Sequence, residues 1–169
     1  GLGGFHLAVN AADHEAVMRL RELKNRPHKP LALMAASIDH LTDYVRINET
    51  EEKLLNTYHR PIVLLAKHED GNDRPVLSSA ISDLNPYYGV MLPYTPLHYL
   101  LLDKGPKVLV MTSGNRSGEP LSIDNDDALD AFSHIADYFL LHDRDIYFRA
   151  DDSIMHVQEG RGRFIRRSR

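Results

Sequence analysis

The sequence contains no cysteine in its 169 residues. This absence excludes a disulfide scaffold, a thiolate zinc site, an iron–sulfur cluster and a cysteine nucleophile. It is compatible with a cytoplasmic location, which is our expectation, because disulfides are typical of secreted proteins. No apolar run approaches the ~18–20 residues that a membrane-spanning helix needs, so we predict no membrane span and no membrane partner.

Several well-known sequence motifs are also missing. The chain has no G-x-G-x-x-G, no Walker A and no G-x-S-x-G pattern. Dinucleotide-binding, P-loop and hydrolase-elbow functions therefore lose their usual sequence support. The ten histidines include no H-x-H or H-x-x-x-H pair, and we predict no metal site made by the protein alone.

The composition is that of one globular domain, with 43% hydrophobic and 26% charged residues. The net charge of -4 is unevenly distributed, because residues 161–169 hold five arginines and no acid. Without those five arginines, residues 1–160 carry 15 basic and 24 acidic side chains, a net charge of -9. Such a basic end is typical of contact with a polyanion or of a junction to a further segment.

Apolar runs alternate with helical patterns along the chain, which predicts an α/β (α+β) domain. The runs predict strands at 5–9, 31–36, 61–66, 89–92, 107–111, 138–141, 153–157 and 163–165. Helical spacing predicts helices at 13–23, 38–45, 49–58, 97–102 and 124–132, and residues 68–74 predict a polar turn. The connections are irregular, which favours a mixed sheet over a regular doubly wound fold.

Lys24 and Arg26 follow the first predicted helix and precede Pro27. Proline disfavours helical geometry at the residue before it, and in extended backbone residues i and i+2 point the same way. A lysine and an arginine on one side would suit a polyphosphate, with Lys29 close by. The alternative is a basic helix C-terminus that interacts with the helix dipole.

A loop of small residues, Thr112–Pro120, follows the predicted strand at 107–111. Ligands of open α/β sheets bind beyond the carboxyl ends of strands, where this loop would lie. Ser113 and Asn115 offer side-chain hydrogen bonds, and successive backbone N–H groups can bind an anion. The alternative is an ordinary polar connection between a strand and a helix.

Asp151 and Asp152 form a pair of acids ahead of the strand predicted at 153–157. They could meet Mg²⁺ that arrives with a nucleotide, or pair with basic residues elsewhere. Neighbouring side chains on a strand point to opposite sides, which disfavours a dedicated metal site.

Together these residues resemble a known family. Lys24-x-Arg26, followed far downstream by Ser113-x-Asn115, is similar to the K-x-R…S-x-N pattern of YrdC-like domains. Longer sequence segments resemble, more specifically, the YrdC-like domain of the HypF carbamoyltransferases of [NiFe]-hydrogenase maturation. Five segments carry this resemblance in order: GLGGFHL at 1–7, RPHKPLA at 26–32, MLPYTPLH at 91–98, TSGNRSGEP at 112–120 and DDS at 151–153.

The resemblance implies a twisted mixed sheet around a basic cavity, and a single YrdC-like domain over residues 1–169 of a longer multidomain chain. It also implies that ATP, with Mg²⁺, and carbamate derived from carbamoyl phosphate give carbamoyl adenylate and pyrophosphate. In HypF the carbamoyl group then passes, through the rest of the chain, to the C-terminal cysteine of HypE and becomes the cyanide ligand of the hydrogenase iron.

By the same resemblance, Lys24 and Arg26 are the candidate catalytic residues, and they contact the phosphates and carboxyl oxygens. Ser113 and Asn115 bind the α-phosphate and ribose side. Ser153 and Arg166 are further candidates for binding ATP or carbamoyl adenylate, from the end of the fold.

Other functions remain open at this stage. The same fold makes threonylcarbamoyl adenylate for tRNA modification, and relatives of this domain serve O-carbamoyltransferases of natural-product synthesis. A third alternative is not an enzyme: the arginine-rich end and a basic cavity could form an RNA-binding module, whose affinity would fall steeply with salt.

Overall fold

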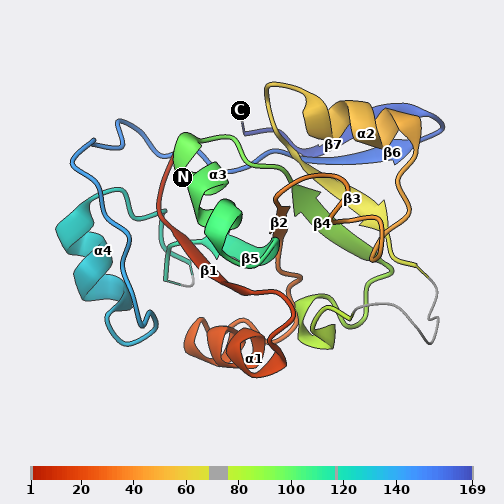
Figure 1. The fold of residues 1–169 in the computed structure, drawn as a ribbon. Helices are drawn as coiled ribbons and strands as arrows, with labels where there is room; N and C mark the ends of the chain where they lie inside the picture. Colours follow the sequence, from red (N-terminus) through yellow and green to blue (C-terminus); the bar gives the residue numbers. More distant parts are fainter. Residues whose placement is uncertain (1, 69–75, 117, 169) are drawn as a thin grey trace.

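The computed structural model describes residues 2–68, 76–116 and 118–168. In this part of the chain, seven strands form one sheet with helices around it (Figure 1). The strands are β1 (His6–Asn10), β2 (Leu33–Ala35), β3 (Ile62–Ala66), β4 (Tyr87–Met91), β5 (Val108–Ser113), β6 (Ile154–Gln158) and β7 (Arg161–Arg166). The helices are α1 (His14–Leu23), α2 (Glu49–Asn56), α3 (Pro96–Lys104), α4 (Asn125–Phe132) and the short 3₁₀ helix η1 (Ser79–Ile81).

The sheet is mixed, with the strand order β1-β5-β2-β4-β3-β6-β7. The β2–β4 and β3–β6 pairs are parallel, and the other neighbouring pairs are antiparallel. This arrangement confirms the mixed sheet that the irregular connections predict. Within the described residues, no helix is both long and apolar enough to cross a membrane.

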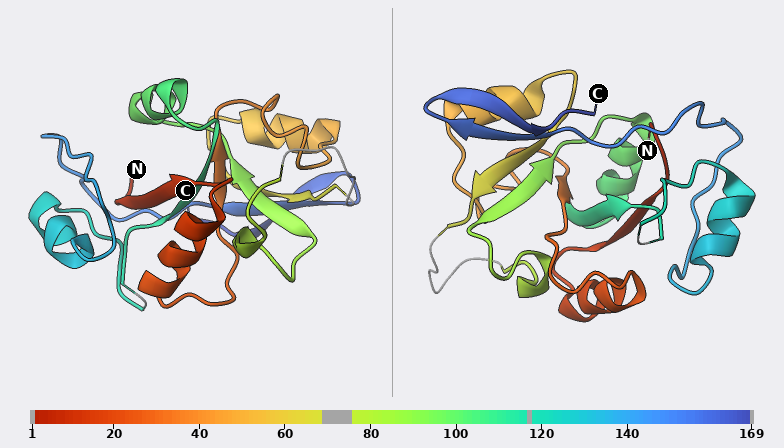
Figure 2. Two further views of the ribbon diagram at one scale, coloured as in Figure 1. Left: turned by 60° about the horizontal axis from the view of Figure 1, so that its bottom comes forward. Right: turned by 180° about the vertical axis from the view of Figure 1, so that it is seen from behind.

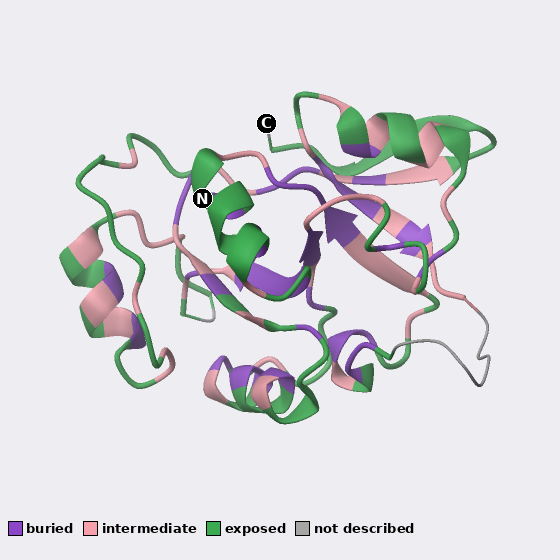
Figure 3. Ribbon diagram, viewed as in Figure 1, coloured by how far each residue is buried: buried purple, intermediate pink, exposed green. Residues whose placement is uncertain are grey.

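Alternation along β5 divides the core between the two faces of the sheet, since successive strand residues point to opposite sides. Val108 and Val110 belong to a large cluster that includes residues of α1, whereas Leu109 and Met111 join a smaller cluster with Leu102 of α3. The left view of Figure 2 shows α1 and α3 on opposite faces of the sheet. Figure 3 shows the central strands buried and the edge strand β7 exposed.

The end of α1 determines how the chain enters the candidate site. Asp13 is the N-cap of α1, and its side chain accepts a hydrogen bond from the Ala16 N–H; Lys24 is the C-cap residue. Asn25 then adopts a left-handed conformation with φ 47°, which asparagine tolerates better than most residues. This single turn leads the chain out of the helix directly before Arg26.

Two predicted elements are absent from the described structure. Residues 38–45 form no helix: residues 39–44 are turns in which Leu41 and Tyr44 donate to carbonyls three residues earlier, and Val45 forms an isolated antiparallel bridge with Lys67. Residues 138–141 form no strand, and Tyr138 and Leu140 are exposed without sheet partners. The polar turn predicted at 68–74 lies almost wholly outside the described residues.

Candidate functional site

An open cavity of about 700 Å³ lies between the α1–β2 connection, the end of β5 and the segment around β6 and β7. This volume is within the usual range for small-molecule sites. Apolar residues of three strands supply one wall: Ile62, Leu64, Gly89 and Ile154. Five of the six predicted site residues also line the cavity: Lys24, Arg26, Ser113, Asn115 and Arg166.

Lys24 is buried at the edge of the cavity, and its ammonium group is bound to the loop after β5. Its Nζ donates to the carbonyl oxygens of Ser113 at 2.5 Å and Asn115 at 3.2 Å. Burial, together with the positive charges of Arg26 and Lys29, lowers the pKa of Lys24 to about 8. Lys24 is therefore mostly charged at neutral pH, but its charge is sensitive to mild alkali.

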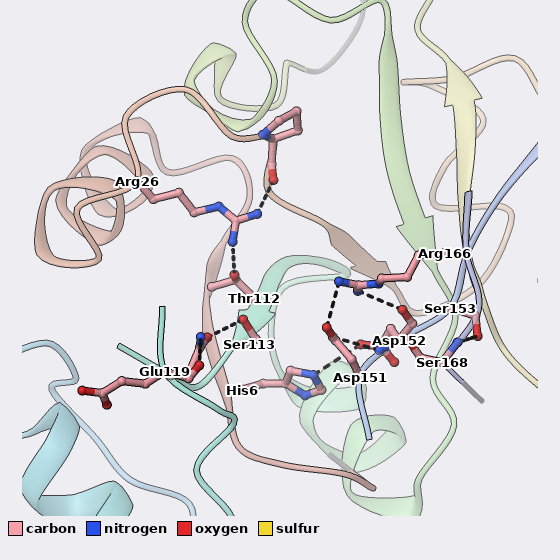
Figure 4. A network of polar contacts seen from close by, with 12 residues as sticks. His6, Arg26, Thr112, Ser113, Glu119, Asp151, Asp152, Ser153, Arg166 and Ser168 are labelled. Atoms are coloured by element: carbon pink, nitrogen blue, oxygen red, sulfur yellow. Dashed lines mark hydrogen bonds and ion pairs between the residues drawn. The ribbon is translucent and has the colours of Figure 1, made fainter. Parts of the chain in front are cut away.

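Arg26 reaches from the α1–β2 connection toward β5 (Figure 4). Its Nη2 donates to the Pro30 carbonyl at 2.7 Å, and its Nη1 lies 3.5 Å from Thr112 Oγ1. Burial lowers the pKa of Arg26, as do the charges of Arg21 and Arg166, whereas Asp151 raises it. The neighbouring cations thus repel one another, and a bound anion would relieve that repulsion.

Ser113 and Asn115 lie where β5 becomes a loop. Thr112 and Ser113 are the last two residues of β5, so the strand extends into the segment predicted as a loop. The Oγ of Ser113 donates to Asn115 Oδ1 at 2.6 Å, and Asn115 Nδ2 donates to the carbonyls of Arg116 and Glu119. The two side chains therefore fix the loop's shape, which in turn places the carbonyls that hold Lys24.

Gly114 is required by close packing at this point. Its N–H donates to the Phe5 carbonyl at 2.7 Å, and a Cβ built on Gly114 would lie 2.8 Å from that oxygen. Only glycine allows the two backbones to approach so closely. This hydrogen bond joins the loop to the residue that precedes β1.

Arg166 and Asp151 form the opposite side of the site (Figure 4). Arg166 Nη1 lies 2.8 Å from Asp151 Oδ2, and its Nη2 donates to the Asp152 carbonyl at 2.9 Å. Ser153 is fully buried and does not line the cavity; its Oγ accepts a hydrogen bond from the Ser168 N–H. Ser153 thus holds the chain that follows β7, beside the site rather than in it.

Sequence reasoning did not single out the apolar wall or the partner of His6. Ile62 and Leu64 are two residues apart on β3, and this period-two spacing was the available signal for a shared face. The Nε2 of His6 lies 3.6 Å from Oδ2 of the cavity residue Asp152. That contact joins segments 146 residues apart, so no local pattern could reveal it.

The described residues offer no group of three or more His, Cys, Asp or Glu side chains that could hold a metal ion. Asp151 and Asp152 are the acids of the cavity lining. They could supply one or two oxygen ligands to an Mg²⁺ that is also held by phosphates, which is the usual way this ion binds with nucleotides.

The fold and the sequence agree with one family of known proteins. The family model Sua5_yciO_yrdC, described as "Telomere recombination", matches residues 1–168. The chain belongs to the Sua5/YciO/YrdC family.

Within that family, the chain is similar to the HypF carbamoyltransferases. It is 47% identical over 169 residues to Carbamoyltransferase HypF of Synechocystis, covering all of this chain and 22% of that protein. A crystal structure of full-length HypF in the phosphate- and nucleotide-bound form has a TM-score of 0.93 and 47% identity, with 100% of this chain and 26% of that chain covered. The chain thus spans about a quarter or less of these relatives.

A crystal structure of P. abyssi Sua5 complexed with L-threonine is more distant, with a TM-score of 0.81 and 20% identity over 98% of this chain and 48% of that one. At this identity the likeness supports the fold alone. Together the comparisons confirm the predicted YrdC-like fold and the resemblance to the HypF domain.

Proposed function

We propose that this chain makes carbamoyl adenylate and pyrophosphate from ATP and carbamate. The observation that carries the proposal is the convergence of Lys24, Arg26 and Arg166, from two distant parts of the sequence, on one cavity. The mutual repulsion of Arg26 and Arg166 favours a ligand with several negative charges. The similarity to HypF, which has a nucleotide-bound crystal structure, supports a nucleotide as that ligand.

The reaction needs charge neutralisation and alignment more than proton transfer. A carbamate oxygen attacks the α-phosphorus of ATP, the bond between that phosphorus and the bridging oxygen breaks, and pyrophosphate leaves. Both reactants are anions, so the site must offset their repulsion and hold them in line. Lys24 and Arg26 would hold phosphate and carboxylate oxygens, and Arg166 would approach from the opposite side.

The loop after β5 would meet the α-phosphate and the ribose. In this proposal Ser113 turns its hydroxyl from Asn115 to the ligand, while Asn115 maintains the loop through its two backbone hydrogen bonds. Ser153 would contribute indirectly, by holding the chain that follows Arg166. Mg²⁺ would arrive with ATP and offset phosphate charge, with Asp151 and Asp152 as its nearest protein oxygens.

The wider role proposed for the chain follows from HypF. The chain would be a single domain, residues 1–169, of a longer multidomain protein in the cytoplasm. Carbamoyl phosphate would supply the carbamate, and the rest of the polypeptide would pass the carbamoyl group to HypE during hydrogenase maturation. The similarity to carbamoyltransferases along the whole chain supports this assignment.

Calorimetry with Mg-ATP tests the site. We expect Lys24→Ala and Arg26→Ala to weaken binding by at least about tenfold, because each removes a charge-assisted contact to phosphate. Arg161→Ala is the matched control, since Arg161 is exposed on β7 and does not line the cavity. Unchanged affinity in both cavity variants would remove the assignment. A loss confined to Arg161→Ala, with a steep salt dependence, would instead support a surface that binds RNA.

A further inference from the structure

Arg21 is a buried cation on α1, and the proposed reaction does not use it. Its side chain connects two segments that are distant in sequence, the α1–β2 connection and η1. Nη1 donates to the carbonyls of Arg26 at 2.7 Å, Pro27 at 3.2 Å and Lys29 at 3.2 Å. On the η1 side, Nε donates to the Ala80 carbonyl and Nη2 donates to the Ile81 carbonyl at 3.0 Å.

Arg21 thus uses its guanidinium to bind several backbone carbonyls rather than to form an ion pair. In the described part of the chain, the hydrogen bonds of its guanidinium all end on main-chain oxygens. Burial lowers the pKa of Arg21, and the negative charge of Asp83 acts in the opposite direction. A planar group with donors in two directions suits this task, whereas the ammonium of lysine has three donors at one point.

The segment that Arg21 holds has solvent-accessible space on both sides. Residues 25–28 line the proposed ATP cavity, and the same four residues line a second cavity of about 400 Å³ beside α1 and η1. Packing against other side chains is therefore limited along this wall. The hydrogen bonds from Arg21 join this wall to α1 and η1 and so contribute to fixing its position.

Arg21 and Arg26 are also joined directly through the main chain. The Arg26 N–H donates to the Arg21 carbonyl at 2.9 Å, and the Arg26 carbonyl accepts from Arg21 Nη1. The backbone of Arg26 is thus fixed on both sides of its Cα. The direction in which its guanidinium enters the cavity depends on that backbone.

We propose that Arg21 is the positioning residue for Arg26, and that the phosphate-binding element is Arg21-x-x-Lys24-x-Arg26 rather than the last two residues alone. The expected effect of Arg21 on ATP binding rests on the proposed function, whereas the claim that Arg21 positions Arg26 does not. Arg21 does not line the ATP cavity itself, so it acts through Arg26.

The structural part is tested by amide hydrogen exchange in Arg21→Lys and Arg21→Gln. The informative amides are those of Arg26, which donates to Arg21, and Leu31, which donates to Ile81. We expect both to exchange at least about tenfold faster in either variant, since the wall would open locally. Arg19→Lys is the matched control, because Arg19 is an exposed residue of the same helix that pairs with Asp137.

The functional part is tested by a double-mutant cycle for Mg-ATP affinity. We expect Arg21→Lys to weaken binding about tenfold in the wild-type background and to have no further effect when Arg26→Ala is present. A purely structural role would give the same fold loss in both backgrounds. Equal losses, or exchange rates that match those of Arg19→Lys, would overturn the proposal.

Two further outcomes remain distinguishable. If the wild-type chain does not bind Mg-ATP, the proposed function fails, and the exchange rates alone decide whether Arg21 holds the wall. If neither Arg21 variant folds, NMR of the wild-type guanidinium decides. The Nη groups of Arg21 should rotate and exchange far more slowly than those of the exposed Arg161, and equal rates would contradict the proposal.

Discussion

Mildly alkaline conditions should weaken Mg-ATP binding, because they remove the proton of Lys24. Burial, together with Arg26 and Lys29, gives this ammonium a pKa of about 8. If only the charged form binds phosphate, affinity falls about tenfold for each pH unit above that pKa, and binding at about pH 9.5 is about thirtyfold weaker than at about pH 7. Because bound phosphate raises the pKa of Lys24, the decline ends at the pKa of the complex.

Stability should change in the opposite direction over the same range. The pKa of Lys24 is lower in the folded chain than its ordinary value of 10.5, so the unfolded chain binds the proton more tightly. The free energy of unfolding should therefore receive a contribution from Lys24 that increases between about pH 8 and 10.5. Lost affinity in this range would then not reflect lost folding.

Calorimetry at constant ionic strength measures the effect. Lys24→Met should bind weakly and without the slope above about pH 8. Lys53→Met is the matched control, because Lys53 is an exposed residue of α2 that pairs with Glu49, and this variant should keep the full slope. A flat profile for the wild-type chain, or an unchanged slope in Lys24→Met, would refute the reasoning.

Three further substitutions separate the proposed roles. Arg26→Lys should lower the rate of ATP–pyrophosphate exchange about 10–100-fold, because lysine cannot reproduce the planar fork; equal rates would leave Arg26 no role beyond its charge. Asp151→Asn should raise the affinity for ATP without Mg²⁺ a fewfold in calorimetry, because it frees Arg166 from its ion pair; unchanged or weaker binding would mean that this pair does not compete with the ligand. Ser153→Ala should lower the melting temperature by about 2–4 °C, through the lost bond from Ser168, and leave affinity unchanged; weaker ATP binding would place Ser153 in the site.

The two segments that carry Lys24, Arg26, Ser113 and Asn115 could be predicted because their signals are local, whereas their meeting in one site was implied by the resemblance to YrdC-like domains. Pro27 indicated that the helix ends before Arg26, and the small residues after β5 indicated a loop beyond a strand. The structure adds the left-handed Asn25, which lies between Lys24 and Arg26 where the sequence predicted extended backbone. The direction of the chain was predictable, but the conformation that produces it was not.

The role of Arg21 could not be predicted, because it depends on distant partners. Val17, Leu20 and Leu23 are the apolar residues at helical spacing on α1, yet the structure buries Arg21 and leaves Leu23 partly exposed. An arginine becomes favourable there because Ala80 and the α1–β2 connection bring backbone carbonyls to it, which accept its hydrogen bonds. The pattern of hydrophobic residues cannot indicate where distant backbone carbonyls will lie.

The predicted helix at 38–45 fails for a related reason. Leu41 and Val45 are buried and Ile38 packs against them, as the helical spacing indicated. The spacing of apolar residues indicates which side chains face the core, but successive turns can bury the same side chains as a helix would. The strand expected at 138–141 lacked this support, because an apolar run needs a neighbouring strand to pair with, and Tyr138 remains exposed.

Carbamate-dependent ATP–pyrophosphate exchange tests the central proposal most directly. Labelled pyrophosphate, Mg-ATP and carbamate formed from ammonium and bicarbonate would be mixed with this chain, and in parallel with a full-length HypF supplied with carbamoyl phosphate. We predict that this chain incorporates label into ATP only when ammonium and bicarbonate are both present, that HypF does so when carbamoyl phosphate is present, and that Arg26→Ala abolishes the exchange. Exchange that requires threonine and bicarbonate instead, or no exchange in either protein, would contradict the assignment of carbamoyl adenylate formation to this domain.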